Sequence, residues 1–274
     1  MSRGASQDRR GIEESLRADA RRMLFSNAVV DEFVASATLA ELRAVAGLLE
    51  RQMEMRASNQ LARRMRRAKF PAIKSMDGYD FSQIGFPEGY GADDLKSLGF
   101  IDACQDFVFH GKTGRGKTHL AIAVGIAAAN AGKTVRFFTV AQLVMHLVEA
   151  REKGRLKREL DDILATDLLI LDELGYVPLD IEGARLLYQV MSAPEGRQSM
   201  LITTNIEFSK WGTIFADDKL AAAIIDRIVH HGRLLEFTGQ SRRVSEALMF
   251  GRTSAGPASG PKEKTKEQAG TLLD

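Results

Sequence analysis

A glycine-rich octapeptide between two apolar segments constrains this chain more than any other feature. Residues 111–118 match the pattern G-x-x-x-x-G-K-[ST] at every fixed position. The apolar run Phe107–Phe109 precedes them, and the alanine-rich run Thr118–Asn130 follows, with Gly132 as its predicted stop. A strand, a glycine loop and a helix in this order predict a phosphate-binding turn in an α/β fold.

The chemistry of such a turn assigns a role to each residue type. Glycines let backbone N–H groups wrap phosphate oxygens, and the start of the helix adds partial positive charge. Lys117 is predicted to reach the β- and γ-phosphates of ATP, and Thr118 to offer its hydroxyl to Mg²⁺. His119 is also explained by helix packing or a hydrogen bond. The predicted nucleotide-binding residues are Gly111, Lys112, Thr113, Gly114, Arg115, Gly116, Lys117, Thr118 and His119.

A second motif supplies carboxylates. The apolar run Leu168–Leu171 is followed by Asp172 and Glu173, and α/β sheets bind ligands at the carboxyl ends of their strands. We predict that Asp172 holds Mg²⁺ and that Glu173 polarises the attacking water in ATP hydrolysis. The alternative for both is a pair of carboxylates at the start of a helix.

Three further residues are candidates for catalysis. Asn205 follows the apolar run 201–204 and could hydrogen-bond the γ-phosphate or its water, although a turn or helix cap would also explain it. Arg227 and Arg243 could stabilise charge that develops during hydrolysis, because Arg has a fixed fork and a permanent charge. Surface ion pairs explain both arginines equally well.

The chain divides into four predicted parts. Residues 1–74 are predicted to form a small, basic, helical N-terminal domain, and residues 75–105 a linker leading into the core. Residues 106–250 are predicted to form the ATPase core, and the polar segment 251–274 to be disordered. Within the core, five β-rich runs alternate with helical stretches, which predicts a parallel five-stranded sheet sandwiched by helices.

Charge and hydropathy suggest where the protein acts. Residues 1–74 hold 15 Lys/Arg and 9 Asp/Glu, whereas the whole chain has a formal charge of only +2. This asymmetry indicates nucleic acid or, equally, a solvated helical face of mixed charge. The apolar runs are shorter than the ~20 residues that span a bilayer, so we expect a cytoplasmic protein without a membrane partner. The N-terminal DNA-binding candidates are Arg63, Arg64, Arg66, Arg67 and Lys69.

These motifs together resemble the IstB-like transposition helper ATPases, which are similar to DnaC-type helicase loaders of the AAA+ superfamily. The resemblance runs from about Leu61 to Leu248. The motifs that carry it are Arg66-Arg67-Ala68-Lys69-Phe70-Pro71, Asp80-Phe81, Gly116-Lys117-Thr118-His119-Leu120-Ala121, Asp172-Glu173-Leu174-Gly175-Tyr176, Thr204-Asn205, Trp211-Gly212, Ala222-Ala223-Ile224-Ile225-Asp226-Arg227 and His230-His231. The sequence departs from the commoner family loop at Lys112 and Arg115, neither of which is a fixed position.

The resemblance implies an AAA+ core that assembles head to tail into ATP-bridged homo-oligomers. It places Arg227 at the finger lent to a neighbour's ATP, Asn205 at the first sensor and Arg243 at the second. It also implies duplex DNA and a transposase as partners. The residues that look like a DNA-facing insertion, although a solvated helix face explains them as well, are Arg151, Lys153, Arg155, Lys157 and Arg158.

The sequence therefore predicts an ATP- and Mg²⁺-dependent AAA+ ATPase that assembles on duplex DNA and assists a transposase in target capture. Two alternatives stay open at this point. One is a DnaC-like helicase loader acting in DNA replication. The other is a scaffold in which ATP joins subunits with negligible turnover, against which Glu173 argues.

Overall fold

The computed structural model describes residues 2–192, 196–215 and 217–239. Arg243, the end of the predicted core and the predicted tail 251–274 lie outside these residues. The helices, in chain order, are α1 (Ser2–Arg22), α2 (Asn27–Ser36), α3 (Leu39–Ala68), α4 (Ala92–Ser97), α5 (Gly99–Asp102), α6 (Lys117–Asn130), α7 (Val140–Glu152), α8 (Leu156–Leu164), α9 (Ile181–Met191), a 3₁₀ turn (Phe208–Lys210), α10 (Trp211–Phe215) and α11 (Asp218–His231).

The sheet is mostly parallel. Its strands are β1 (Ile84–Gly85), β2 (Asp106–His110), β3 (Val135–Thr139), β4 (Leu168–Leu174), β5 (Ser199–Thr204) and β6 (Gly232–Phe237). They lie in the order β1-β6-β2-β5-β4-β3, and β2 to β6 pair in parallel. The five predicted strands are therefore present, but the predicted strand count was one too low. The sixth strand, β1, pairs antiparallel with β6 and is only two residues long, too short to leave a periodic pattern.

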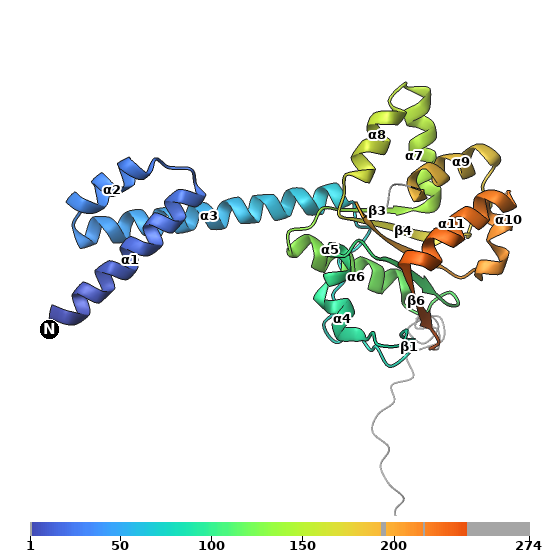
Figure 1. The fold of residues 1–274 in the computed structure, drawn as a ribbon, viewed down its shortest axis with the longest axis horizontal. Helices are drawn as coiled ribbons and strands as arrows, with labels where there is room; N and C mark the ends of the chain where they lie inside the picture. Colours follow the sequence, from blue (N-terminus) through green and yellow to red (C-terminus); the bar gives the residue numbers. More distant parts are fainter. Residues whose placement is uncertain (1, 193–195, 216, 240–274) are drawn as a thin grey trace, which may run out of the picture.

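Helices cover both faces of this sheet (Figure 1). Neighbouring residues of one strand enter different cores: Phe107 and Phe109 pack with α4, α5 and α6, whereas Val108 packs with α7 to α11. Both faces are thus buried, which explains why the strands read as continuous apolar runs rather than alternating ones. The layers bring the carboxyl ends of β2, β4 and β5 to one edge of the sheet, beside the start of α6.

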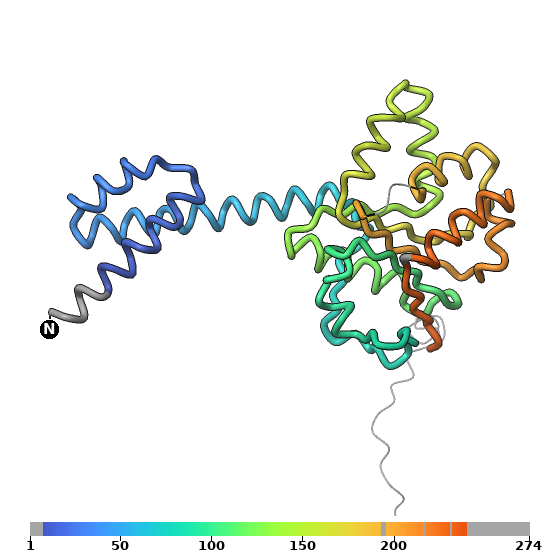
Figure 2. The backbone as a smooth tube through the Cα atoms, viewed as in Figure 1, coloured from blue at the N-terminus to red at the C-terminus, as the bar shows by residue number. Residues whose placement is uncertain are grey.

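The N-terminal helices α1, α2 and α3 pack on one another around a separate small core that includes Leu16, Val34 and Leu42. A capping box between Thr38 and Glu41 begins α3. This helix continues for 30 residues from the three-helix unit to the α/β core, as the trace in Figure 2 shows. It ends before Pro71, as predicted, with Lys69 in the left-handed conformation at φ 58°.

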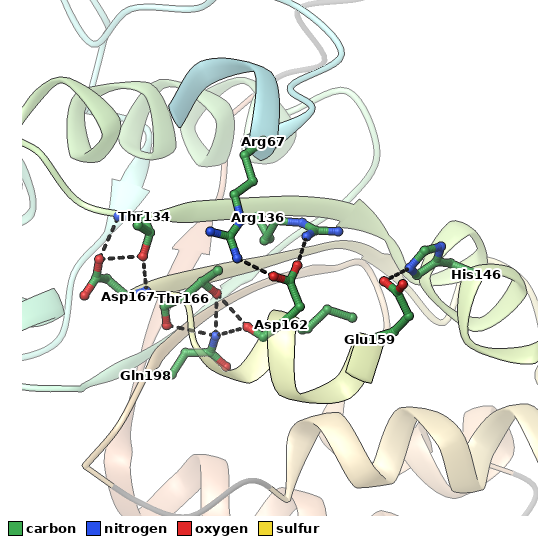
Figure 3. Close-up of polar contacts among 10 residues, drawn as sticks. Arg67, Thr134, Arg136, His146, Glu159, Asp162, Thr166, Asp167 and Gln198 are labelled. Carbon is green, nitrogen blue, oxygen red and sulfur yellow. Dashed lines mark hydrogen bonds and ion pairs between the residues drawn. The ribbon is translucent and has the colours of Figure 1, made fainter. Parts of the chain in front are cut away.

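The end of α3 is fastened to the core by polar and apolar contacts. Arg64 Nε donates to the carbonyl of Ala129 at 2.9 Å. Arg67 forms an ion pair with Asp162 of α8, and the other oxygen of that carboxylate accepts from Arg136 of β3 at 2.6 Å (Figure 3). Asp162 therefore links three elements: α3, the edge strand β3 and its own helix α8.

Residues 75–105, for which we predict a linker, contribute β1, α4 and α5. Ile84, Leu95 and Phe100 are buried in the same core as α6. In this part of the chain Tyr79 reaches the glycine loop, where its hydroxyl donates to the carbonyl of Gly116 at 3.4 Å. Among the described helices, none is long and apolar enough to cross a membrane.

Candidate functional site

The predicted phosphate loop connects β2 to α6, and its glycines adopt conformations that other residues rarely adopt. Gly111, Gly114 and Gly116 have φ of 149°, 84° and 93°. A Cβ at Gly111 would lie 2.5 Å from the carbonyl oxygen of Phe237, and one at Gly116 would lie 2.7 Å from the Tyr79 hydroxyl. Neighbouring elements therefore approach the loop so closely that side chains at these positions would displace them.

Lys117 begins α6 and is 9% exposed. Its ammonium group donates to the carbonyl of Gly111 at 2.6 Å and to that of Lys112 at 3.0 Å. Both bonds fold the lysine across its own loop, beside the first N–H groups of α6. Positive charge is thus concentrated where the helix dipole also favours an anion.

The carboxylate predicted to serve Mg²⁺ lies against the start of α6. Asp172 is 3% exposed, and its Oδ1 accepts from the hydroxyls of Thr118 at 2.9 Å and Thr203 at 2.5 Å. Burial raises the pKa of Asp172, while the two hydroxyls and the charge of Lys117 oppose that shift. Hydroxyl and carboxylate oxygens are the hard donors that Mg²⁺ prefers, so Thr118 and Asp172 fit the ion that a bound nucleotide would bring.

Glu173 follows Asp172 in a stretch where β4 departs from regular pairing. The register with β5 shifts between Leu171 and Leu174, and Glu173 has φ 62°, a left-handed conformation that is strained for a non-glycine residue. At this shift, the side chains of Asp172 and Glu173 lie in different environments. Asp172 is buried, whereas the Glu173 side chain is exposed and lines a cavity.

This cavity has a volume of about 430 Å³, within the roughly 300–1,000 Å³ range of small-molecule sites. Its lining residues are Lys74, Thr113, Gly114, Gly116, Lys117, Thr118, His119, Ile122, Glu173, Tyr176, Thr203, Thr204 and Asn205. The fold thus brings the predicted loop, Glu173 and Asn205 to one hollow. Sequence reasoning missed five of the lining residues as site residues: Lys74, Ile122, Tyr176, Thr203 and Thr204. Tyr176 closely follows Glu173 in a turn, where its N–H donates to the Glu173 carbonyl at 3.2 Å.

Other predicted site residues are not part of the described lining of the cavity. Arg115 turns toward β6, where its guanidinium donates to the carbonyl of Phe237 at 2.8 Å. The backbone of Gly111 donates to the carbonyl of Thr204 at 3.3 Å, which joins the loop to β5. Arg227 lies on α11 and is absent from the described lining.

The DNA-binding candidates lie in two places. On α3 and its end, Arg63, Arg66 and Lys69 are exposed, while Arg64 and Arg67 make the core contacts given above. The second set lies at the turn between α7 and α8. There Arg151 pairs with Glu182 at 2.8 Å, and Lys153 pairs with Glu149. Arg155, Lys157 and Arg158 are exposed at this turn and along the first turn of α8.

The pattern of the family described as IstB-like ATP binding protein matches residues 23–249, more than four fifths of the sequence. The chain belongs to this family. The match begins well before Leu61, so this IstB-like protein shares the family's pattern from the end of α1 onward. The family match confirms the predicted IstB-like ATP-binding protein, and the sheet confirms the predicted parallel α/β core.

Two relatives of this IstB-like protein come from insertion sequences. It is 33% identical to the ATP-binding protein of insertion sequence IS21 from Pseudomonas aeruginosa, over 74% of this chain and 77% of the relative. It is 34% identical to that of IS232 from Bacillus thuringiensis, over 79% of this chain and 87% of the relative. Among solved structures, AMPPCP-bound DnaA from Aquifex aeolicus is 17% identical, with a TM-score of 0.50 over 62% of this chain and 51% of that one. This last likeness concerns the fold alone.

Proposed function

We propose that this IstB-like protein binds ATP and Mg²⁺ in the cavity beside α6, assembles on duplex DNA and assists a transposase in capturing the DNA target. The observation that carries the proposal is the convergence of Lys117, Thr118, Glu173 and Asn205 on one cavity, in a chain that also exposes cations at the turn between α7 and α8. The relatives named for insertion sequences support a role in transposition.

Each residue of the cavity has a role in ATP hydrolysis under this proposal. The loop N–H groups and Lys117 bind the phosphates, and Asn205 orients the γ-phosphate or the water that attacks it. Glu173 polarises that water, because its side chain is exposed and lines the cavity. Mg²⁺, held by Thr118 and Asp172, would neutralise charge on the phosphate oxygens.

Assembly follows from the surface at the mouth of the cavity. Tyr176, which lines the cavity, is 66% exposed, and Val177 and Ile181 close by are 52% and 55% exposed. Exposed apolar side chains beside a ligand site favour a protein contact there. In the proposed assembly a second copy of the chain covers this surface and brings its Arg227, and Arg243 contributes as the second sensor.

DNA binding is assigned to the turn between α7 and α8, together with the exposed cations at the end of α3. Of the turn residues, Arg155, Lys157 and Arg158 are exposed, whereas Arg151 and Lys153 already have acidic partners. Cations on exposed helix surfaces bind phosphates without reading base sequence. We therefore expect duplex binding that depends steeply on salt and little on sequence.

The test is DNA affinity as a function of salt for the variant Lys157→Gln/Arg158→Gln. Its matched control, Arg185→Gln/Lys219→Gln, also removes one exposed arginine and one exposed lysine, from α9 and α11, which lie outside the α7–α8 turn. The first variant should bind duplex DNA more weakly, and the slope of log affinity against log salt should fall by about one for each cation that no longer neutralises a phosphate. The control should retain the wild-type slope.

Equal slopes for the wild type and both variants would overturn the assignment of the turn to DNA. Tighter binding to single-stranded than to duplex DNA would favour the helicase-loader alternative, because such a protein delivers a ring helicase to single strands. Adding a transposase from an insertion sequence of the same type to the DNA-bound protein then tests the partner, which should join the complex only when ATP is present.

A further inference from the structure

Two adjacent threonines of β5 bond the irregular end of β4. Thr203 Oγ1 donates to Asp172 Oδ1 at 2.5 Å and accepts from the backbone N–H of Glu173 at 3.0 Å. Thr204 Oγ1 donates to the carbonyl of Leu174 at 2.8 Å. Both threonines are at most 2% exposed, so water competes little for these bonds. Two buried hydroxyls therefore hold Asp172 and Glu173, where the pairing with β5 is interrupted, and Leu174, where it resumes.

The position of Thr203 matters because Glu173 is held in a conformation it would not adopt by itself. A non-glycine residue at φ 62° persists only where its surroundings impose that conformation. The Glu173 N–H lies in the interrupted stretch of β4 and finds its acceptor in the Thr203 hydroxyl. Without the Thr203 hydroxyl, the Glu173 N–H would need to donate to water, or the backbone would need to change its conformation.

The Thr203 hydroxyl also bonds the carboxylate of Asp172, the residue before Glu173. Thr203 and Thr118 donate to one oxygen of Asp172, which leaves the other carboxylate oxygen without a hydroxyl donor from either of them. The end of β5 then leads directly to Asn205, and the carbonyl of Thr204 accepts from the Gly111 N–H. The strand end thus touches the phosphate loop, both carboxylate residues and Asn205.

We infer that Thr203 is a positioning residue for ATP hydrolysis, which acts by fixing the backbone of Glu173 and the carboxylate of Asp172 together. The inference deepens the proposed ATPase function and rests on it. Valine has nearly the same shape as threonine and would suit a buried strand, so the feature that matters is the hydroxyl. The hydroxyl bonds Glu173, which polarises the water in the proposed reaction, and Asp172, which would bind Mg²⁺.

The experiment compares Thr203→Val, which removes the hydroxyl, with Thr203→Ser, which keeps it. In the full chain without nucleotide, hydrogen exchange of the Glu173 amide should be faster in the valine variant, and serine should restore most of the protection. The kcat for ATP should fall on the order of 10²-fold in the valine variant, because the reacting groups are misplaced. Binding of a non-hydrolysable ATP analogue in EDTA should change less than about threefold.

The outcomes separate this inference from the proposed function. Wild-type exchange and kcat in Thr203→Val would overturn the inference, as would equal losses in the serine and valine variants. Amide exchange is measured without ATP or DNA, so it judges the Thr203 hydrogen bonds even if the wild type proves to hydrolyse no ATP, in which case the proposed function fails. If Thr203→Val does not fold, Thr203→Ala removes the same hydroxyl with a smaller side chain.

Discussion

The hydroxyl of Thr118 donates a 2.9 Å hydrogen bond to the carboxylate of Asp172, 54 residues further along the chain. The bond joins the first turn of α6 to the end of β4, and it needs no nucleotide to form. Two oxygen groups suited to Mg²⁺ are therefore held side by side in advance. The arrangement has an energetic consequence, because a buried carboxylate is disfavoured as the charged form and its pKa is raised.

Asp172→Asn should separate stability from function. Asparagine can still accept from Thr118 and Thr203, and it removes the buried charge. At neutral pH, thermal unfolding of the nucleotide-free variant should therefore occur at the wild-type temperature or above it. Titration of Mg²⁺ at fixed ATP should show affinity weakened by about 10–100-fold. A less stable variant with unchanged Mg²⁺ dependence would contradict this assignment.

The two arginines that share Asp162 should differ in their importance for stability. Arg67 is about half exposed, and such pairs contribute about 0–1 kcal/mol, so Arg67→Ala should change the free energy of unfolding little. The Arg136 side chain is 7% exposed, and Asp162→Asn would leave it without its carboxylate partner. We expect a loss of about 1–3 kcal/mol for Asp162→Asn. Urea unfolding measures both, and an equal or larger loss for Arg67→Ala would refute the ranking.

Tyr90→Phe should be neutral or stabilising. Within the described part of the chain, the buried Tyr90 hydroxyl has no hydrogen-bond partner, and its ring packs beneath the Arg233 guanidinium at 4.7 Å. Phenylalanine keeps the ring and removes the unsatisfied oxygen, so the free energy of unfolding at neutral pH should stay equal or rise by up to about 1 kcal/mol.

The same hydroxyl predicts a pH dependence. Burial raises the pKa of Tyr90 from 10.0 to about 12, with the charge of Arg233 opposing the shift. Between these two values the unfolded chain loses this proton before the folded protein does, so stability falls as pH rises. Tyr90→Phe should lack that part of the decline above pH 10. Chemical unfolding at pH 8 and pH 11 measures it, and parallel declines in both proteins would exclude the effect.

Val177→Asp should weaken ATP-dependent assembly if a second copy covers the mouth of the cavity. A carboxylate buried without a partner is strongly disfavoured, so half-maximal assembly should need at least about tenfold more protein. Met55→Asp is the matched control, because Met55 on α3 is 59% exposed, close to the 52% of Val177. Sedimentation with ATP compares the two, and equal assembly would remove this surface from the interface.

Local sequence signals were enough to predict the phosphate loop and the sheet around it. The strand before Gly111, the alanine-rich helix after it and the apolar run before Asp172 are each encoded within a few residues, so all three were recognisable without tertiary information. The helix beginning at Leu39 was also predictable, since Pro71 limits how far it can run.

Interactions between distant segments were beyond sequence reasoning. β1 forms because Ile84 lies opposite Phe237, and no local pattern shows that pairing. Lys74 reaches the cavity only because the chain after α3 turns back over α6, where Phe70 fills the space that Gly125 leaves open. Arg67 was assigned to DNA from charge alone, and its ion pair with Asp162 depends on how α3 meets α8.

The most direct test of the account compares wild-type protein with Glu173→Gln, following ATP hydrolysis and sedimentation with and without duplex DNA. Glutamine keeps the shape of Glu173 but cannot act as a base, so hydrolysis should fall by about 10²-fold or more. The account predicts that DNA changes turnover by the wild type and that the variant accumulates with ATP as a DNA-bound oligomer. The account would be contradicted if DNA changed neither ATP turnover nor assembly in either protein. That result would favour a protein, rather than DNA, as the partner of this ATP-binding core.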